Sequence, residues 1–235
     1  MKLSQAYFSY ISENTDGRWH PYNILNAFLA MFILGIILNA IPIIGFYREL
    51  KQNDSSVASL FVVFLTVILL IQLCFVMFFY NPERVIKYRK LQAFILPFFL
   101  FKVALDPLIF YWFICMDYNL SFGFYAMGAL ILLISCILFF FRTIEIIKKL
   151  FRGDLKKDGK GLYEIKSFVW SGGSSFIFGI TSIGIAIPQV TVGTSAEGIS
   201  FALTMLVGSL GLSIPIMYAI PETILLSYYL NRYTK

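Results

Sequence analysis

Two charged residues, Lys102 and Asp106, lie inside an otherwise apolar stretch of the sequence, FFLFKVALDPLIFYWF at positions 98–113. Because they are four residues apart, a helix places them on one face, where opposite charges can pair. A charged side chain at the centre of a bilayer costs about 2.5–3.5 kcal/mol on insertion scales, so ionisable residues there are candidates for functional sites. We therefore take Lys102 and Asp106 as the candidate functional pair.

Pro107 follows the aspartate directly and predicts a break in this helix. Proline has no backbone N–H to donate, and its ring obstructs the carbonyl of Val103. An aspartate at the N-cap followed by proline is also a typical helix start, and Lys102 then lies in the last turn of the preceding half-helix. Each charge would face a half-helix end of opposite polarity. Broken helices at this depth are common around transporter binding sites, and the alternative is that the pair only stabilises the break.

The other polar side chains in or near the apolar stretches are amides: Asn26, Asn39, Gln72 and Gln92. We interpret most of them as partners in hydrogen bonds between helices, which contribute about 0.6–2 kcal/mol each in a membrane. Gln72 lies near the middle of its apolar stretch. It is the predicted supporting partner of Lys102 and Asp106.

The sequence contains none of the motifs that intramembrane catalysis needs, because it has no H-E-x-x-H, no G-x-S-x-G and no Walker phosphate motif. The single histidine, His20, has no second histidine with which to build a metal site. The three cysteines lie within or at the edges of apolar stretches, which suits buried thiols. We expect no catalytic residue, no cofactor and no metal.

The composition indicates a membrane protein. Hydrophobic residues make up 59% of the chain and charged residues only 14%, whereas a soluble domain is about 45–50% apolar even with glycine counted. The net charge of +6 is spread between apolar stretches rather than gathered on one helix. We therefore expect no nucleic acid among its partners, and the lipid bilayer as the main one.

We expect an all-α, polytopic helical membrane protein with about six transmembrane helices, formed by a single integral membrane domain over residues 1–235. A span needs about 20 mainly apolar residues. The predicted spans are 24–47, 57–80, 91–115, 122–141, 167–188 and 199–219, with the third broken at Asp106–Pro107. The last apolar region is too long for one crossing, and Pro221 followed by Glu222 is typical of a new helix start. Residues 221–233 are therefore expected to form a C-terminal interfacial helix.

The distribution of basic residues predicts the orientation. Sixteen of the 19 lysine and arginine residues fall on one side of the six-span arrangement and two on the other, with Lys102 inside a span. The excess of basic residues in short loops marks the cytoplasmic side. We expect an integral protein of the plasma membrane with cytoplasmic N- and C-termini.

The longest loop, 142–166, is predicted to be basic and cytoplasmic and to begin with an amphipathic helix that ends at Gly153. On this helix we place an apolar face and a charged face; the apolar residues are Ile144, Ile146, Ile147, Leu150 and Phe151, and the charged residues are Arg142, Glu145, Lys148, Lys149 and Arg152. Such a surface can attract anionic lipid. The alternative is an ordinary solvated loop.

Small residues distinguish the last two predicted spans. Ser171, Ser175 and Gly179 lie on one face of span 167–188, and Thr204, Gly208 and Gly211 on one face of span 199–219. Small residues at this spacing let helices approach closely in lipid. We predict helix packing of these two spans as a tight hairpin, with a polar pathway or cavity as the alternative.

Two non-enzymatic functions fit these features. The first is an accessory or binding component whose partner is another membrane protein or a toxin; in build the chain is similar to polytopic immunity proteins, which protect a bacterial membrane from a toxin. The second is a permease subunit of a multi-component transporter that uses the broken helix at Lys102 and Asp106. The topology resembles the small membrane subunits of importers and ABC-type exporters. The sequence slightly favours the first.

Overall fold

The computed structural model describes residues 20–53, 56–154 and 195–233, and the regular elements within these ranges are all helices. They are α2 (Pro21–Asn53), α3 (Ser56–Phe79), α4 (Pro82–Lys87), α5 (Arg89–Asp117), α6 (Phe122–Arg152) and α8 (Ser195–Tyr233). Five of them, all except α4, are long and apolar enough to cross a membrane. The regular structure of the described residues is therefore all helical, and five helices suit a protein that sits in a bilayer.

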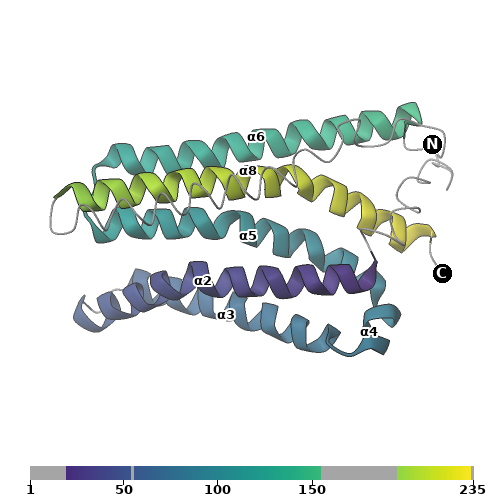
Figure 1. Ribbon diagram of the computed structural model, residues 1–235, viewed down its shortest axis with the longest axis horizontal. Coiled ribbons are helices and arrows are strands. Elements are labelled where there is room, and N and C mark those ends of the chain that lie inside the picture. The colour runs from purple at the N-terminus through teal and green to yellow at the C-terminus, as the bar shows by residue number, and fades with distance from the viewer. Residues whose placement is uncertain (1–19, 54–55, 155–194, 234–235) are drawn as a thin grey trace.

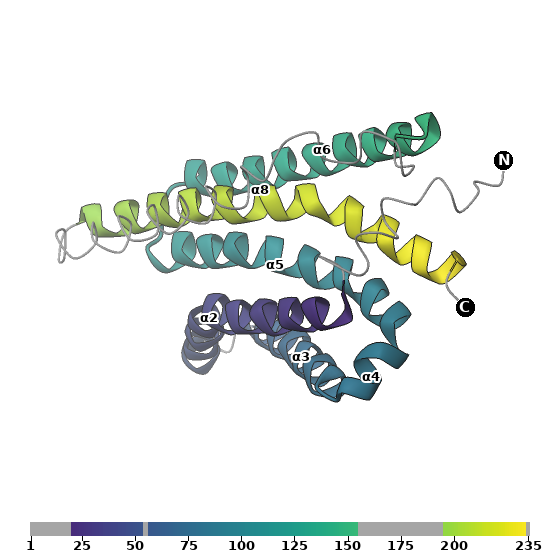
Figure 2. The same ribbon diagram turned by 45° about the vertical axis from the view of Figure 1, so that its right-hand side comes forward.

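Helix α5 is the central element of the bundle (Figure 1). It packs against α8 on one side and α2 on the other, while α3 packs along α2 and α6 along α8. Of the five long helices, α5 is the most buried. The bundle therefore consists of two helix pairs, α2–α3 and α6–α8, joined through α5 (Figure 2).

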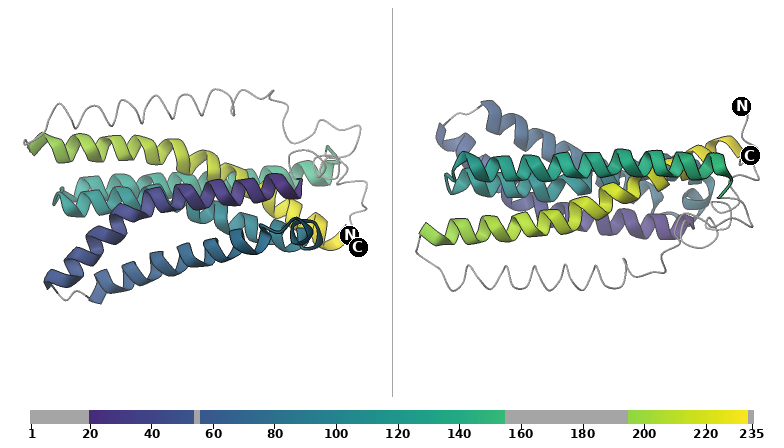
Figure 3. Two further views of the ribbon diagram at one scale, coloured as in Figure 1. Left: turned by 60° about the horizontal axis from the view of Figure 1, so that its bottom comes forward. Right: turned by 90° about the horizontal axis from the view of Figure 1, so that it is seen from above.

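Prolines within the helices accompany changes of direction. Helix α2 bends in its second half, which contains Pro42 (Figure 3). Helix α8 bends toward its C-terminal end, where Pro215 and Pro221 lie (Figure 1). A proline inside a helix removes one backbone hydrogen bond and its ring pushes on the preceding turn, which explains such bends.

The predicted spans 24–47, 57–80, 91–115 and 122–141 correspond to α2, α3, α5 and α6. The predicted span 167–188 lies outside the described residues, so the number of six is not confirmed. The C-terminal end of α6 and the N-terminal end of α8 lie at opposite ends of the bundle (Figure 1).

The break expected at Asp106–Pro107 is not found. Helix α5 is continuous from Arg89 to Asp117, with Pro107 inside it. A transmembrane helix tolerates proline when neighbouring helices satisfy the disturbed backbone. Helix α8 bonds to two other carbonyls near this proline: the hydroxyl of Ser213 donates to the carbonyl of Ala104 (2.6 Å), and that of Ser209 donates to the carbonyl of Pro107 (3.0 Å).

The separate interfacial helix expected at 221–233 is also corrected, since α8 continues through Pro221 to Tyr233. The physical reason is burial. Leu226 and Leu230 lie in a core cluster that also contains residues of α2, α3, α4, α5 and α6. This segment is therefore part of the bundle core, where all the described helices converge.

Helix α6 is longer than its predicted span and continues through the first part of the expected loop 142–166. It ends at Gly153, whose φ of 82° is the left-handed conformation of a C-cap glycine. The predicted end of the amphipathic helix is thus confirmed. Residues 155–166 of the loop lie outside the described residues.

Candidate functional site

The two charges inside α5 form an ion pair. Lys102 Nζ lies 2.6 Å from Asp106 Oδ2, and the side chains are 12% and 1% exposed, respectively. Because α5 is an unbroken helix here, the pairing follows from the four-residue spacing alone. The pair lies at the centre of the bundle on its most buried helix.

Asn39 of α2 extends the polar site toward Asp106. Its side chain is fully buried, donates through Nδ2 to the carbonyl of Gly35 (2.8 Å) and lies against the Asp106 carboxyl group. The amide–carbonyl bond spans one turn of α2, so it fixes the orientation of Asn39. A polar group of α2 is thereby held beside the charged pair of α5.

Gly35 permits a close approach of three helices. A Cβ atom at this position would lie 2.8 Å from Lys102 Nζ and 3.3 Å from the side-chain oxygen of Gln72. Real Cβ atoms do not approach other heavy atoms this closely without displacing them. The glycine therefore gives the lysine head and the Gln72 amide of α3 their place against α2.

Gln72, the predicted supporting partner of the pair, lies near Lys102 at Gly35 but forms no hydrogen bond with Lys102 or Asp106. Both polar atoms of its buried amide lack a hydrogen-bond partner among the described residues, and so do Asn39 Oδ1 and Asp106 Oδ1. Most buried polar groups in native proteins are satisfied. The polar cluster, which we define as Asn39, Gln72, Lys102 and Asp106, therefore has unused capacity to accept and donate hydrogen bonds.

Three of the six residues predicted for helix packing, Ser171, Ser175 and Gly179, lie outside the described residues. The other three lie in α8. Thr204 donates its hydroxyl to the carbonyl of Ser200 within α8 (2.9 Å), and Gly211 is half-buried. No described atom lies within 4 Å of the position that a Cβ would take at Gly208.

Ser209 and Ser213 make the contact that sequence reasoning missed. Their hydroxyls bond to α5 on either side of the Asp106–Pro107 step. The four-residue spacing of two serines in an apolar span was the available signal. The packing prediction for this span used Thr204, Gly208 and Gly211 instead.

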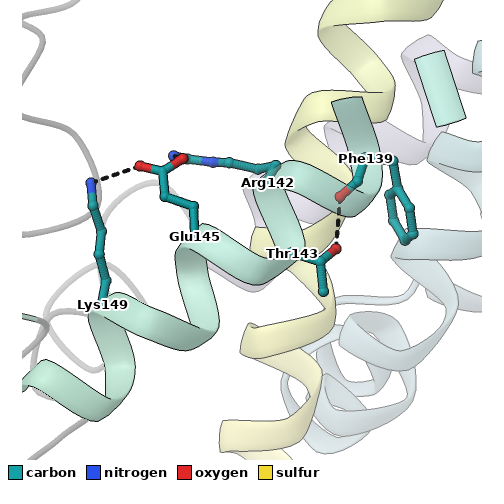
Figure 4. Close-up of polar contacts among 5 residues, drawn as sticks. All are labelled: Phe139, Arg142, Thr143, Glu145 and Lys149. Atoms are coloured by element: carbon teal, nitrogen blue, oxygen red, sulfur yellow. Dashed lines mark hydrogen bonds and ion pairs between the residues drawn. The ribbon is translucent and has the colours of Figure 1, made fainter. Parts of the chain in front are cut away.

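The prediction that Arg142 lies on the charged face of its helix is wrong. Its side chain is buried, with only 3% exposed. It shares a stripe of α6 with the buried Ile146. Its guanidinium group lies 4.6 Å from the ring centroid of Tyr218 in α8 and its Nη1 lies 2.6 Å from Glu145 Oε2. Glu145 also pairs with Lys149 at 3.1 Å (Figure 4).

Thr143 satisfies its own hydroxyl within α6 by donating to the carbonyl of Phe139 (2.8 Å; Figure 4). Arg142 and its neighbours thus form a charged contact between α6 and α8 that is separate from the polar cluster on α5. Among the described residues there is no group of three or more histidine, cysteine or acidic side chains that could hold a metal ion.

No protein-family model, curated protein or solved structure matches this chain.

Proposed function

We propose that this protein is a non-enzymatic membrane component that acts by binding, and that the polar cluster is the part of it that recognises a partner or ligand within the bilayer. The observation that supports this is the buried Lys102–Asp106 pair, which is surrounded by amide groups with unused hydrogen-bonding capacity. Ionisable residues at this depth are usually retained for function.

Stability alone is a weak reason for such a cluster. Replacing a buried ion pair by well-packed apolar residues is often neutral or stabilising, and each unsatisfied buried polar group costs about 1–3 kcal/mol. Helix α5 is in addition held to α8 by the serine hydroxyls and to α6 by the Tyr111 hydroxyl, which donates to the carbonyl of Phe124 (2.6 Å). The cluster is therefore not needed to attach α5.

The partner class that we propose is another membrane protein or a membrane-active toxin, as for an accessory or immunity-type component. Helix α3 contributes Gln72 to the cluster, yet it packs mainly along α2 and has little contact with α5. Much of its surface is apolar and exposed, including Leu60, Val63 and Phe64. A partner helix that approaches along α3 would reach the polar cluster by displacing the fewest contacts.

We further propose that the protein resides in the plasma membrane with its basic end in the cytoplasm. The exposed basic residues of α4, of the end of α6 and of the end of α8 gather at one end of the bundle (Figure 1). The positive-inside bias assigns this end to the cytoplasm.

Site-specific photocrosslinking in cells tests the binding proposal. A photoreactive residue would replace Leu70 of α3 or, as the matched control, Leu133 of α6; these side chains are 54% and 56% exposed. We expect a discrete protein or peptide adduct from position 70 that is lost when Lys102→Met and Asp106→Asn are combined. Identical adducts from both positions, unchanged by the double substitution, would contradict the proposal.

A permease subunit is the second candidate, and the position of the cluster favours it. The pair lies on the helix that joins α2–α3 to α6–α8. In many transporters a polar site at mid-depth lies between two bodies that move relative to each other. Solute flux in proteoliposomes that depends on Lys102 and Asp106 would support this candidate over the accessory function.

A further inference from the structure

Helix α4 forms a corner between α3 and α5 at the basic end of the bundle (Figure 2). Asn81 caps it by accepting a hydrogen bond from the backbone N–H of Glu83 (2.9 Å), and Pro82 occupies its first turn. Val85 is fully buried in the core cluster, whereas the next residue, Ile86, is 63% exposed. The corner is thus anchored on one side and presents an apolar side chain on the other.

Two exposed cations lie on the same corner. The Arg84 guanidinium group lies 5.2 Å from the ring centroid of Phe78, and Lys87 Nζ lies 5.6 Å from that of Tyr88. The two residues are three apart in α4, so they lie on one side of it. Neither forms an ion pair with a carboxylate of the described residues, and this includes the exposed Glu83 nearby.

The C-terminal end of α8 repeats this arrangement at the same end of the bundle. Arg232 lies 5.8 Å from the ring centroid of Tyr228 and 6.0 Å from that of Tyr233. Tyrosine rings prefer the headgroup level of a bilayer. Lys87 and Arg232, which lie over tyrosine rings, are therefore placed at the depth of the lipid phosphates, and Arg84 lies one turn from Lys87.

We propose that the α4 corner is a binding site for the phosphate headgroup of an anionic phospholipid. Arg84 and Lys87 contact the phosphate, and Ile86 extends into the acyl region beside it. Because Arg84 and Lys87 pair with no carboxylate of the described residues, charge complementarity favours an anionic ligand, and the exposed Ile86 favours a lipid over a soluble anion. The site is separate from the loop 142–166, for which the sequence predicted attraction of anionic lipid.

Native mass spectrometry of the purified full chain tests this site. The detergent-solubilised protein would be titrated with phosphatidylglycerol and with phosphatidylethanolamine of the same acyl chains. We expect the double substitution Arg84→Gln/Lys87→Gln to weaken phosphatidylglycerol binding about tenfold or more, since each basic residue near a membrane surface contributes about 1 kcal/mol. Binding of phosphatidylethanolamine should not change, and Arg84→Lys/Lys87→Arg should restore the preference.

The matched control is Lys148→Gln/Arg152→Gln, which removes two exposed cations from the end of α6. Equal losses in the two double variants would mean a diffuse attraction by the whole basic end and would overturn the proposal. Unchanged phosphatidylglycerol binding in the α4 variant would overturn it as well. Thermal melting of each variant separates loss of lipid from loss of fold.

Discussion

Lys102 and Asp106 form one ion pair, but their side chains differ in how deeply they are buried. The aspartate side chain is 1% exposed and the lysine side chain 12% exposed. A lysine ammonium on its long flexible stem can move toward a more polar region, whereas a short carboxylate cannot. Replacing Lys102 should therefore lower the free energy of unfolding more than replacing Asp106.

A double-substitution cycle measures this coupling. We expect Lys102→Met to lower the free energy of unfolding by about 3–5 kcal/mol, because it leaves a buried carboxylate without its partner. Asp106→Asn should have a smaller effect of the same sign, and the double variant should recover most of the stability. Thermal and chemical unfolding in detergent gives the interaction energy, which should be about as large as the Lys102→Met loss, about 3–5 kcal/mol, because the double variant recovers most of that loss. An interaction energy near zero would show that the charges act separately.

The ion pair of Lys102 and Asp106 could be read from the sequence because the spacing of charges along one helix is a local property. The sequence did not predict Gly35, since the need for a glycine there arises from a lysine and a glutamine on two other helices. It placed Arg142 wrongly for a related reason. Periodicity shows which residues share a face of α6, but the neighbour α8 decides which stripe is buried.

Hydroxyl groups and small residues determine how the helices fit together. The interface of α5 with α8 contains Ser209 and Ser213, which donate to α5 carbonyls at the level of Pro107. The approximate positions of α2, α3, α5 and α6 followed from apolar length, and the end of α6 followed from Gly153. The pairing of helices did not, because apolar spans that are equally rich in leucine and phenylalanine have no local feature that names their neighbours.

The serine contacts should contribute unequally. Ser213 donates to Ala104 alone in the described structure, whereas Ser209 shares its proton between Pro107 and Met205 of its own helix. We expect Ser213→Ala to cost about 1–2 kcal/mol and Ser209→Ala about half of that. Ser135→Ala is the control, because this buried hydroxyl has no hydrogen-bond partner among the described residues. Equal melting temperatures for all three variants would argue against the hydroxyl contacts.

Gly45 and Gly208 differ in how closely other side chains approach them. A Cβ at Gly45 would overlap the ring of Phe113, a buried residue of α5, whereas a Cβ at Gly208 meets no described atom within 4 Å. We expect Gly45→Ala to destabilise the protein by about 1–3 kcal/mol through overpacking. Gly208→Ala should be neutral or stabilising by about 0.5–1 kcal/mol, because alanine is the better helix former. Melting in detergent compares them, and a larger loss at position 208 would instead support close packing there.

The exposed basic residues of α4 and of the C-terminal ends of α6 and α8 lie at one end of the bundle, and the end of α6 and the start of α8 lie at opposite ends (Figure 1). Composition and the length of the apolar stretches predicted the helical membrane class. They could not predict that α5 would join two helix pairs, because that order depends on contacts between residues about 100 positions apart, such as Ser213 with Ala104.

The orientation and the further crossing can be tested together by cysteine accessibility. In a background with the cysteines at 74, 115 and 136 replaced by alanine, Asp154→Cys and Ser195→Cys would be introduced one at a time. An impermeant thiol reagent applied to intact cells should label position 195, and should label position 154 only after the cells are permeabilised. The positive-inside bias sets the expected direction, since Arg152 and the other basic residues lie at the end that contains Asp154. Labelling of both positions from the same side would rule out a crossing between them, and the reverse pattern would invert the orientation while keeping the crossing.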